Sequence, residues 1–332
     1  MPTVRPSLEP WLGLSLAEAP LAPLKQAPRA SPDALRATLY ASCRYLLRAI
    51  LAGVDGAGGD VVDAVILTTI MDANIGYLDD NPALTWRHAT YAAGPPEGYR
   101  RPITVSALAE RLGLAYETTR RRVDGLIAQG RCVRTEHGIH ARLLDEPRHH
   151  AGSQANYAAV RTLLRDLQTR APEIGWPMAE AAEAKTEDPP LRLVNRRCAV
   201  FAIDTLRRFA DLSGGYGEAL VYMGVVEATG RGATDDVWPS LRTSSLARSL
   251  NQPIPSIRRR VQTLMARGLV TAQGSGFDAR PAAAMEPEVS RLAVANLKRL
   301  YELFRQLEAL GVALETDARQ APAARQAFEG PR

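Results

Sequence analysis

The stretch TVSALAERLGLAYETTRRRVDGLIAQG, Thr104 to Gly130, occurs in this chain a second time in related form. The second form reads RTSSLARSLNQPIPSIRRRVQTLMARG, Arg242 to Gly268, and the two align without a gap at an offset of 138 residues. Their apolar positions coincide, and both carry Arg-Arg-Arg-Val at the same place. A repeat of this length indicates that one structural unit is used twice.

Each copy predicts two helices joined by a sharp turn. In the first copy, a short helix over 105–112 is broken by Gly113, and a second helix runs from about 116 to 129. The following residues 131–144, RCVRTEHGIHARLL, alternate around His-Gly and predict a β-hairpin. Residues 269–280 predict the same hairpin in the second copy. A helix-turn-helix followed by a hairpin is a winged helix.

The similarity extends to both sides of this core. Residues 58–67 resemble 213–222 at an offset of 155, and each begins an apolar helix that ends near Tyr77 or Thr229. Further helices are expected before these, over about 33–52 and 193–211. Downstream, an apolar stripe begins at Asn156 and at Asn296, at an offset of 140. Each copy therefore predicts helix, helix, helix-turn-helix, hairpin and helix.

This pattern predicts a mainly α fold with small β-wings. We expect two tandem winged helix-turn-helix domains whose flanking helices form an intramolecular pseudo-dimer. The expected parts are a flexible arm (1–31), the first winged-helix repeat (32–170), a linker (171–191), the second repeat (192–312) and a flexible tail (313–332).

The first copy has an insertion before its helix-turn-helix. The change of offset from 155 to 138 places seventeen additional residues within 79–102, a stretch rich in Pro, Gly and aromatic residues. Such a segment is typical of a functional loop. Its Trp86, Tyr91 and Tyr99 either cover a ligand cleft or anchor the loop on the core.

The second helix of each helix-turn-helix carries the candidate DNA-reading residues. At 100° per residue, Thr119, Val123 and Leu126 define its buried face, so Arg121 points away from the core. An outward Arg can enter the major groove and bond guanine O6 and N7. The predicted base-reading residues are Thr118, Arg121, Ser256, Arg259 and Gln262.

Arginines beside this outward face are placed for DNA phosphates. The predicted backbone-contacting residues are Arg120, Arg122, Arg258, Arg260, Arg134 and Arg280. Two observations oppose this interpretation. Three consecutive Arg also fit a solvated helix face, and Glu117 and Asp124 lie on the outer face of the first copy, where they repel phosphate. The wing arginines either contact DNA or keep the hairpins soluble.

The pattern S-x-LA-x-x-L, then R-x-V-x-x-L-x-x-x-G and a hairpin, resembles that of winged-helix transcriptional regulators. The closest layout is that of the multiple-antibiotic-resistance regulator (MarR) type, in which terminal helices form a homodimer that presents two recognition helices. The resemblance implies a recognition role for Thr118, Arg120 and Arg121, and for Ser256, Arg258 and Arg259. The MarR wing often carries Asp-x-Arg, which is present here as Asp278-Ala279-Arg280. This chain departs from the family in holding two such units.

The sequence thus predicts a regulator of transcription that binds double-stranded DNA. Because the outward residues of the two copies differ, we expect two non-identical half-sites, about 34 Å apart for successive major grooves. The resemblance is also compatible with a small-molecule effector and with a homodimer in addition to the internal one. A tandem winged-helix scaffold of the chromosome-segregation type and a plasmid-type replication initiator are the alternatives.

Composition is compatible with DNA binding without requiring it. The chain of 332 residues has a net charge of +5, and 46% of its residues are hydrophobic. Three unpaired Cys, no HExxH spacing and no phosphate-binding Gly loop lead us to expect no enzyme, cofactor or metal site. The Pro-rich start lacks the apolar core of a signal peptide, and we expect a cytoplasmic, nucleoid-associated protein with no membrane contact.

Overall fold

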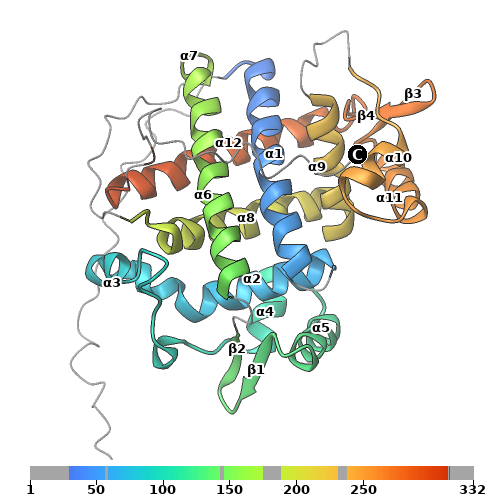
Figure 1. Ribbon diagram of the computed structural model, residues 1–332. Coiled ribbons are helices and arrows are strands. Elements are labelled where there is room, and N and C mark those ends of the chain that lie inside the picture. The colour runs from blue at the N-terminus through green and yellow to red at the C-terminus, as the bar shows by residue number, and fades with distance from the viewer. Residues whose placement is uncertain are drawn as a thin grey trace, which may run out of the picture.

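A computed structural model describes residues 30–56, 59–142, 146–174, 188–230, 238–312 and 314. These residues are mainly helical and include two small antiparallel hairpins (Figure 1). The elements of the first half are α1 (Pro32–Gly56), α2 (Val61–Ile75), η1 (Gly76–Asp80), α3 (Pro82–Arg87), η2 (Glu97–Tyr99), α4 (Val105–Leu112), α5 (Tyr116–Ala128), β1 (Cys132–Thr135), β2 (Gly138–Ala141), α6 (Glu146–Thr169) and α7 (Ala171–Ile174). Those of the second half are α8 (Leu191–Ser213), α9 (Tyr216–Gly230), α10 (Thr243–Ser249), α11 (Ile254–Ala266), β3 (Thr271–Gln273), β4 (Gly276–Asp278) and α12 (Glu286–Ala309).

The observed helices and hairpins confirm the positions that the repeat predicts. The short helix α4 has the predicted bounds, α5 ends one residue earlier than expected, and both hairpins lie where the alternation placed them. The long helices α1 and α8 each extend a few residues beyond their predicted ends. The predicted arm and tail, and residues 175–187 of the predicted linker, lie outside the described residues, apart from a few positions at their edges.

The turn between the two helices of each unit is made by equivalent residues. Gly113 has φ +64°, and Asn251, at the same place in the second copy, has φ +49°. Both angles lie in the left-handed region, which Gly and Asn adopt at the lowest cost. In both copies the next amide donates to a carbonyl of the first helix: Leu114 to Ala109 at 3.0 Å, and Gln252 to its equivalent at 2.9 Å.

Each hairpin is held against the apolar helix of its own repeat. The backbone N–H of Ala141 donates to Oδ1 of Asn74 at 2.9 Å, and the N–H of Ala279 donates to Oγ1 of Thr229 at 3.1 Å. Asn74 and Thr229 are equivalent at the offset of 155. A third segment also pairs with each hairpin, through the bridges Ile103–Ile139 and Leu241–Phe277.

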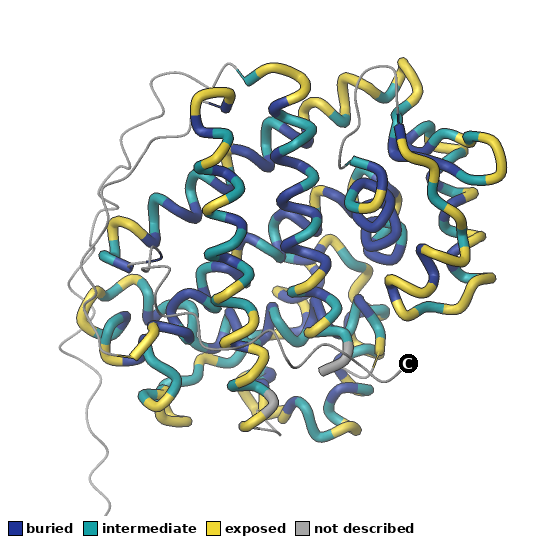
Figure 2. Tube along the Cα trace, turned by 45° about the horizontal axis from the view of Figure 1, so that its top comes forward, coloured by how far each residue is buried: buried dark blue, intermediate teal, exposed yellow. Residues whose placement is uncertain are grey.

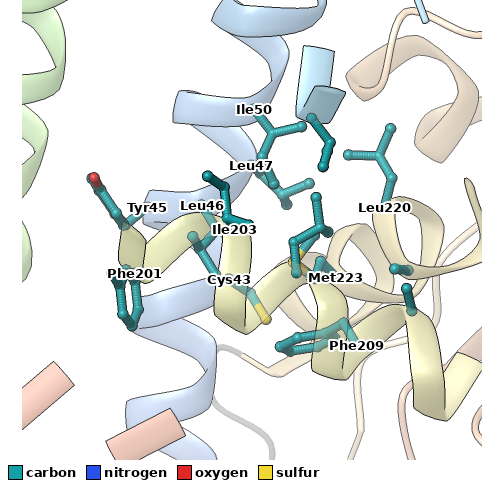
Figure 3. Packing of buried hydrophobic residues seen from close by; sticks show 14 of the residues in the cluster. Cys43, Tyr45, Leu46, Leu47, Ile50, Phe201, Ile203, Phe209, Leu220 and Met223 are labelled. Carbon is teal, nitrogen blue, oxygen red and sulfur yellow. The ribbon is translucent and has the colours of Figure 1, made fainter. Parts of the chain in front are cut away.

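One hydrophobic core runs through both repeats. Helix α1 packs on α9 and α12 of the second repeat, and α8 packs on α2 and α6 of the first. The buried surfaces of these helices face the centre of the molecule (Figure 2). Figure 3 shows Leu46 and Leu47 of α1 in one apolar cluster with Phe209 of α8 and Met223 of α9. The two repeats therefore share their apolar interior.

The most apolar helix lies within this core. The segment Val61–Asp80 is long and apolar enough to cross a membrane by length and composition. In the structure it packs against α1, α8, α9, α5 and β2, and half of it is buried. The apolar composition of this segment is therefore explained by its packing in the core of the protein.

The insertion within 79–102 joins the first repeat to the second. Trp86 of α3 donates from Nε1 to the carbonyl of Leu310 at 3.0 Å. Nε of Arg192 on α8 donates to the carbonyl of Tyr91 at 2.8 Å, and its guanidinium lies over the Tyr91 ring. The aromatic residues of this loop thus act as anchors, which was one of the two roles that the sequence left open.

Candidate nucleic-acid interface

The second helix of each unit is presented at the surface by the apolar helix of its own repeat. In Figure 1, α5 and the β1–β2 hairpin lie at the bottom of the molecule, and α11 lies at its right-hand edge below the β3–β4 hairpin. Each of these helices packs on the apolar helix of its own repeat, α5 on α2 and α11 on α9. Since α2 and α9 are part of the shared core, the scaffold fixes where both helices are presented.

The buried face of each presented helix matches its prediction. Thr119, Val123 and Leu126 are buried in α5, and Ile257, Val261 and Leu264 are buried in α11. The opposite face carries the exposed residues Arg121 and Arg259, as the helical period requires. Of the other predicted base-reading residues, Gln262 is exposed and Thr118 and Ser256 are half-buried.

Three of the predicted arginines have free guanidinium groups. Arg121, Arg258 and Arg259 are exposed and form no ion pair or side-chain hydrogen bond with any residue that the structure describes. Among the predicted residues, the second copy thus has two such arginines and the first has one.

The first copy is partly neutralised by its own acidic residues. Arg120 bonds the carboxylate of Glu117 at 2.9 Å and lies 3.5 Å from that of Asp124. The hydrogen bond that Arg120 donates to Glu117 raises the pKa of Arg120. Arg134 of the hairpin reaches Asp124 at 2.6 Å. Arg120 and Arg134, both predicted to contact phosphates, therefore form surface ion pairs that DNA would have to displace.

The structure reassigns Arg122 and Arg260, which were predicted to contact the DNA backbone. Nη1 of Arg122 lies 3.0 Å from Asp60 and 3.1 Å from Asp63, at the start of α2. Burial lowers the pKa of Arg122, but these two carboxylates outweigh burial and raise it. Both bonds tie α5 to the scaffold, and we leave Arg122 out of the interface.

The equivalent residue of the second copy is held in a similar way. Nη1 of Arg260 donates to Oε1 of Gln252 at 2.7 Å, and its Nε lies 3.9 Å from Glu218. Glu218 corresponds to Asp63 at the offset of 155. The third Arg of each triplet thus fastens its helix to the apolar helix behind it, and Arg260 is likewise left out. The alignment of 58–67 with 213–222 pairs Asp63 with Glu218. An acidic residue at the same position of both apolar helices was therefore the sequence feature that could have predicted these bonds to Arg122 and Arg260.

The last predicted wing residue, Arg280, lies at the base of the second hairpin. Its Nη2 is 3.3 Å from Oδ2 of the fully buried Asp278, and its own side chain is 41% exposed. The Asp-x-Arg pair is thus an internal ion pair with one face toward solvent. Arg280 remains a candidate for a phosphate contact on its exposed side.

The charge of the two units differs because of their acidic residues. Residues 104–142 carry as many Arg as residues 242–280, but the first stretch also carries Glu110, Glu117, Asp124 and Glu136. The second stretch carries Asp278 alone, and this residue is buried. The solvent-exposed surface of the second unit is therefore more positive than that of the first.

The described residues include three cysteines and several His, Asp and Glu side chains that could serve as nucleophiles or metal ligands. Among the described residues, no three His, Cys, Asp or Glu side chains are placed to hold a metal ion. The three cysteines are free and buried, and burial raises the pKa of Cys132 to about 11 and that of Cys198 to about 12. Thiols with such pKa values are poor nucleophiles at neutral pH.

Two exposed apolar residues, Tyr116 and Ile254, were not among the predicted site residues. They begin α5 and α11, and their positions are equivalent at the offset of 138. Their signal in the sequence is a large apolar residue outside the stripe that forms the buried helix face.

Comparison with known proteins found no relative of this chain. No protein family, curated protein or solved structure matches this chain.

Proposed function

We propose that the chain is a tandem winged-helix protein that binds double-stranded DNA and regulates transcription. The observation that carries the proposal is the free arginine at one register of two equivalent helices, Arg121 on α5 and Arg259 on α11. Each helix is followed by a hairpin, β1–β2 after α5 and β3–β4 after α11 (Figure 1). A guanidinium on such a helix can bond guanine in the major groove, and a hairpin that follows such a helix can contact the flanking backbone.

The packing of the long helices supports an intramolecular pseudo-dimer. Contacts between the repeats come in matching pairs, α1 with α12 and α8 with α6. Each pair includes a buried or half-buried polar contact: Ser42 donates to Asn296 at 2.9 Å, and Asn156 donates to Asn195 at 2.7 Å. Asn156 and Asn296 are equivalent at the offset of 140. In a homodimer one such contact would occur twice by symmetry.

The proposed target has two unlike half-sites, and the second unit binds more tightly. Arg258 and Arg259 are free on α11, whereas on α5 Arg120 is paired with Glu117 and Asp124. Displacing an ion pair offsets part of what a phosphate contact contributes. Loss of Arg259 is therefore expected to weaken binding more than loss of Arg121.

The proposal is tested with the full chain and a random duplex library. Enriched sites are measured by fluorescence anisotropy for the wild type, Arg121→Ala and Arg259→Ala. We expect each variant to lose about 1–3 kcal/mol on the preferred site, or roughly 5- to 150-fold in affinity. Affinity should also fall steeply with salt, because phosphate binding releases counterions.

A matched control is Arg305→Ala. It changes the net charge by the same amount, and Arg305 belongs to the C-terminal part of α12, on the opposite side of Figure 1 from α5 and α11. We expect it to bind DNA like the wild type. If Arg121→Ala and Arg259→Ala bind no more weakly than this control, the assignment of α5 and α11 is wrong. If the wild type binds no duplex DNA, the protein-binding scaffold becomes the better hypothesis.

A further inference from the structure

Two of the most exposed apolar side chains occupy the same position in the two units. Tyr116 is 49% exposed and Ile254 is 45% exposed, and each is the first residue of its helix, α5 or α11. The other large apolar residues exposed in the described part of the chain are Val133 and Val200. Val133 corresponds to Thr271 of the second copy, so its exposure is not repeated.

Scattered apolar residues on a surface need no explanation, but a repeated one does. The two copies have diverged at most outward positions, including Glu117, where the second copy has Pro255, and Asp124, where it has Gln262. A large apolar side chain is nevertheless present at the start of both helices. Since it contributes little to the core in either copy, its presence indicates a contact outside the chain.

The neighbours of these residues are the candidate DNA-binding cations. Arg120 follows Tyr116 by four residues, and Arg258 follows Ile254 by four, so each pair shares one side of its helix. The next residues, Arg121 and Arg259, are the free outward arginines. A DNA edge that accepts these arginines would therefore also meet Tyr116 or Ile254.

We propose that Tyr116 and Ile254 each contact the C5-methyl group of a thymine in the major groove. This inference rests on the proposed function and adds the base that each half-site requires. The thymine methyl is the apolar group that the major-groove edges of the four bases present, and apolar side chains contact it directly. Each half-site should accordingly contain a thymine close to the guanine read by Arg121 or Arg259.

Deoxyuridine provides the test, because it lacks the C5-methyl group and keeps the hydrogen-bonding edge of thymine. Sites are first enriched with the full wild-type chain, and each thymine is then replaced singly by deoxyuridine. One replacement in each half-site should weaken wild-type binding about 4-fold, the affinity equivalent of burying one methyl group. The same replacements are then measured with Tyr116→Ala and Ile254→Ala.

The expected result is a specific coupling between residue and base. Tyr116→Ala should lose its sensitivity to deoxyuridine in one half-site and keep it in the other, and Ile254→Ala should show the reverse. Tyr116→Phe is the matched control: it keeps the ring and should keep the sensitivity, which also shows that the phenol oxygen is not the reader. Circular dichroism should show all three variants folded, because the side chains are exposed.

Two results would overturn the inference while leaving the proposed function in place. In the first, the chain binds an enriched site and depends on Arg121 and Arg259, but no deoxyuridine replacement weakens it. In the second, Tyr116→Ala and Ile254→Ala respond to deoxyuridine as the wild type does, so the methyl groups are read elsewhere. A chain that binds no duplex at all overturns the proposed function, and the inference with it.

Discussion

A buried ion pair between the repeats offers the sharpest test of how this fold is held together. Asp79 of η1, in the first repeat, accepts bonds from Arg196 of α8, in the second, at 2.7 and 3.0 Å. Both side chains are only 4% exposed. Arg197 approaches the other carboxylate oxygen at 3.3 Å. One carboxylate thus bonds two guanidinium groups at the junction of the repeats.

Replacing Asp79 with Ala would leave the charge of Arg196 buried without a counterion. Breaking a buried pair in this way costs about 3–5 kcal/mol. Arg196 would keep its hydrogen bond to the carbonyl of His88 at 3.0 Å and a weaker one to that of Thr85 at 3.5 Å. These bonds solvate part of the charge, so we expect a loss of about 3 kcal/mol. Total stabilities are about 5–15 kcal/mol, and the variant should therefore be markedly less stable.

The assay is urea unfolding followed by circular dichroism for the wild type, Asp79→Ala, Arg196→Met and the double variant. The double variant should be more stable than Asp79→Ala, because it buries no unpaired charge at Arg196. Asp33→Ala is the control, since the Asp33–Arg36 pair is a surface pair with Asp33 73% exposed and should be worth less than about 1 kcal/mol. Because the repeats share one core, we expect a single unfolding transition.

The reasoning would be refuted by a loss below about 1 kcal/mol for Asp79→Ala, the size expected of a surface pair. It would also fail if the cost of the double variant equalled the sum of the single costs, since the two side chains would then not be coupled. Two separate unfolding transitions would contradict the shared core.

Three further predictions concern the hairpins, the thiols and one buried carboxyl. Asn74→Ala removes two hydrogen bonds to the carbonyls of Arg101 and Ile139 and one from the N–H of Ala141, so it should lower the free energy of unfolding in urea by about 3 kcal/mol. Thr229→Ala removes one hairpin bond, that from the N–H of Ala279, and should cost about 1 kcal/mol. Equal costs would show that Asn74 does not hold its hairpin through these three bonds. Iodoacetamide at neutral pH should label no cysteine of the folded protein and all three in denaturing urea, as read by mass spectrometry, because burial raises the pKa of each thiol; rapid labelling of the native protein would show that a thiol is accessible. Burial raises the pKa of Asp72 above its ordinary 3.8 despite the nearby Arg111, so the folded state binds this proton more tightly than the unfolded state. The resulting stabilisation is present below pH 3.8 and is lost as pH rises through the raised pKa. Asp72→Asn should therefore make the free energy of unfolding in urea depend less on pH in that window. An unchanged slope in Asp72→Asn would place the titration elsewhere.

The bounds of the local elements could be predicted because local chemistry sets them. A left-handed turn at Gly113, alternation in the hairpins and the apolar period of the helices are each properties of a few consecutive residues. The second copy made these patterns stronger, because an accidental pattern is not expected to recur at one offset over more than twenty residues. The positions of the helices and hairpins were confirmed on this basis.

The roles of single arginines could not be predicted in the same way. Arg120, Arg121 and Arg122 are consecutive, and the helical period assigns them only to directions around one axis. Whether a direction leads to solvent, to a neighbouring carboxylate or to another helix depends on residues far away in the chain. Arg122 finds Asp60 and Asp63 some sixty positions earlier, while Arg121 finds no partner in the described structure.

The sequence by itself determined that one unit is present twice, where the helices and the hairpin of each unit lie, and which face of each second helix is buried. These follow from periodicity and turn chemistry, which act over one or two helical turns. The tertiary structure alone decided that the insertion fastens one repeat to the other through Asp79, Trp86 and Tyr91. It also decided that the third Arg of each triplet bonds the scaffold. A charged group or an indole N–H forms a hydrogen bond with a partner that lies within about 3 Å. Which partner lies there is set by tertiary packing, because packing brings together residues that are far apart in the chain.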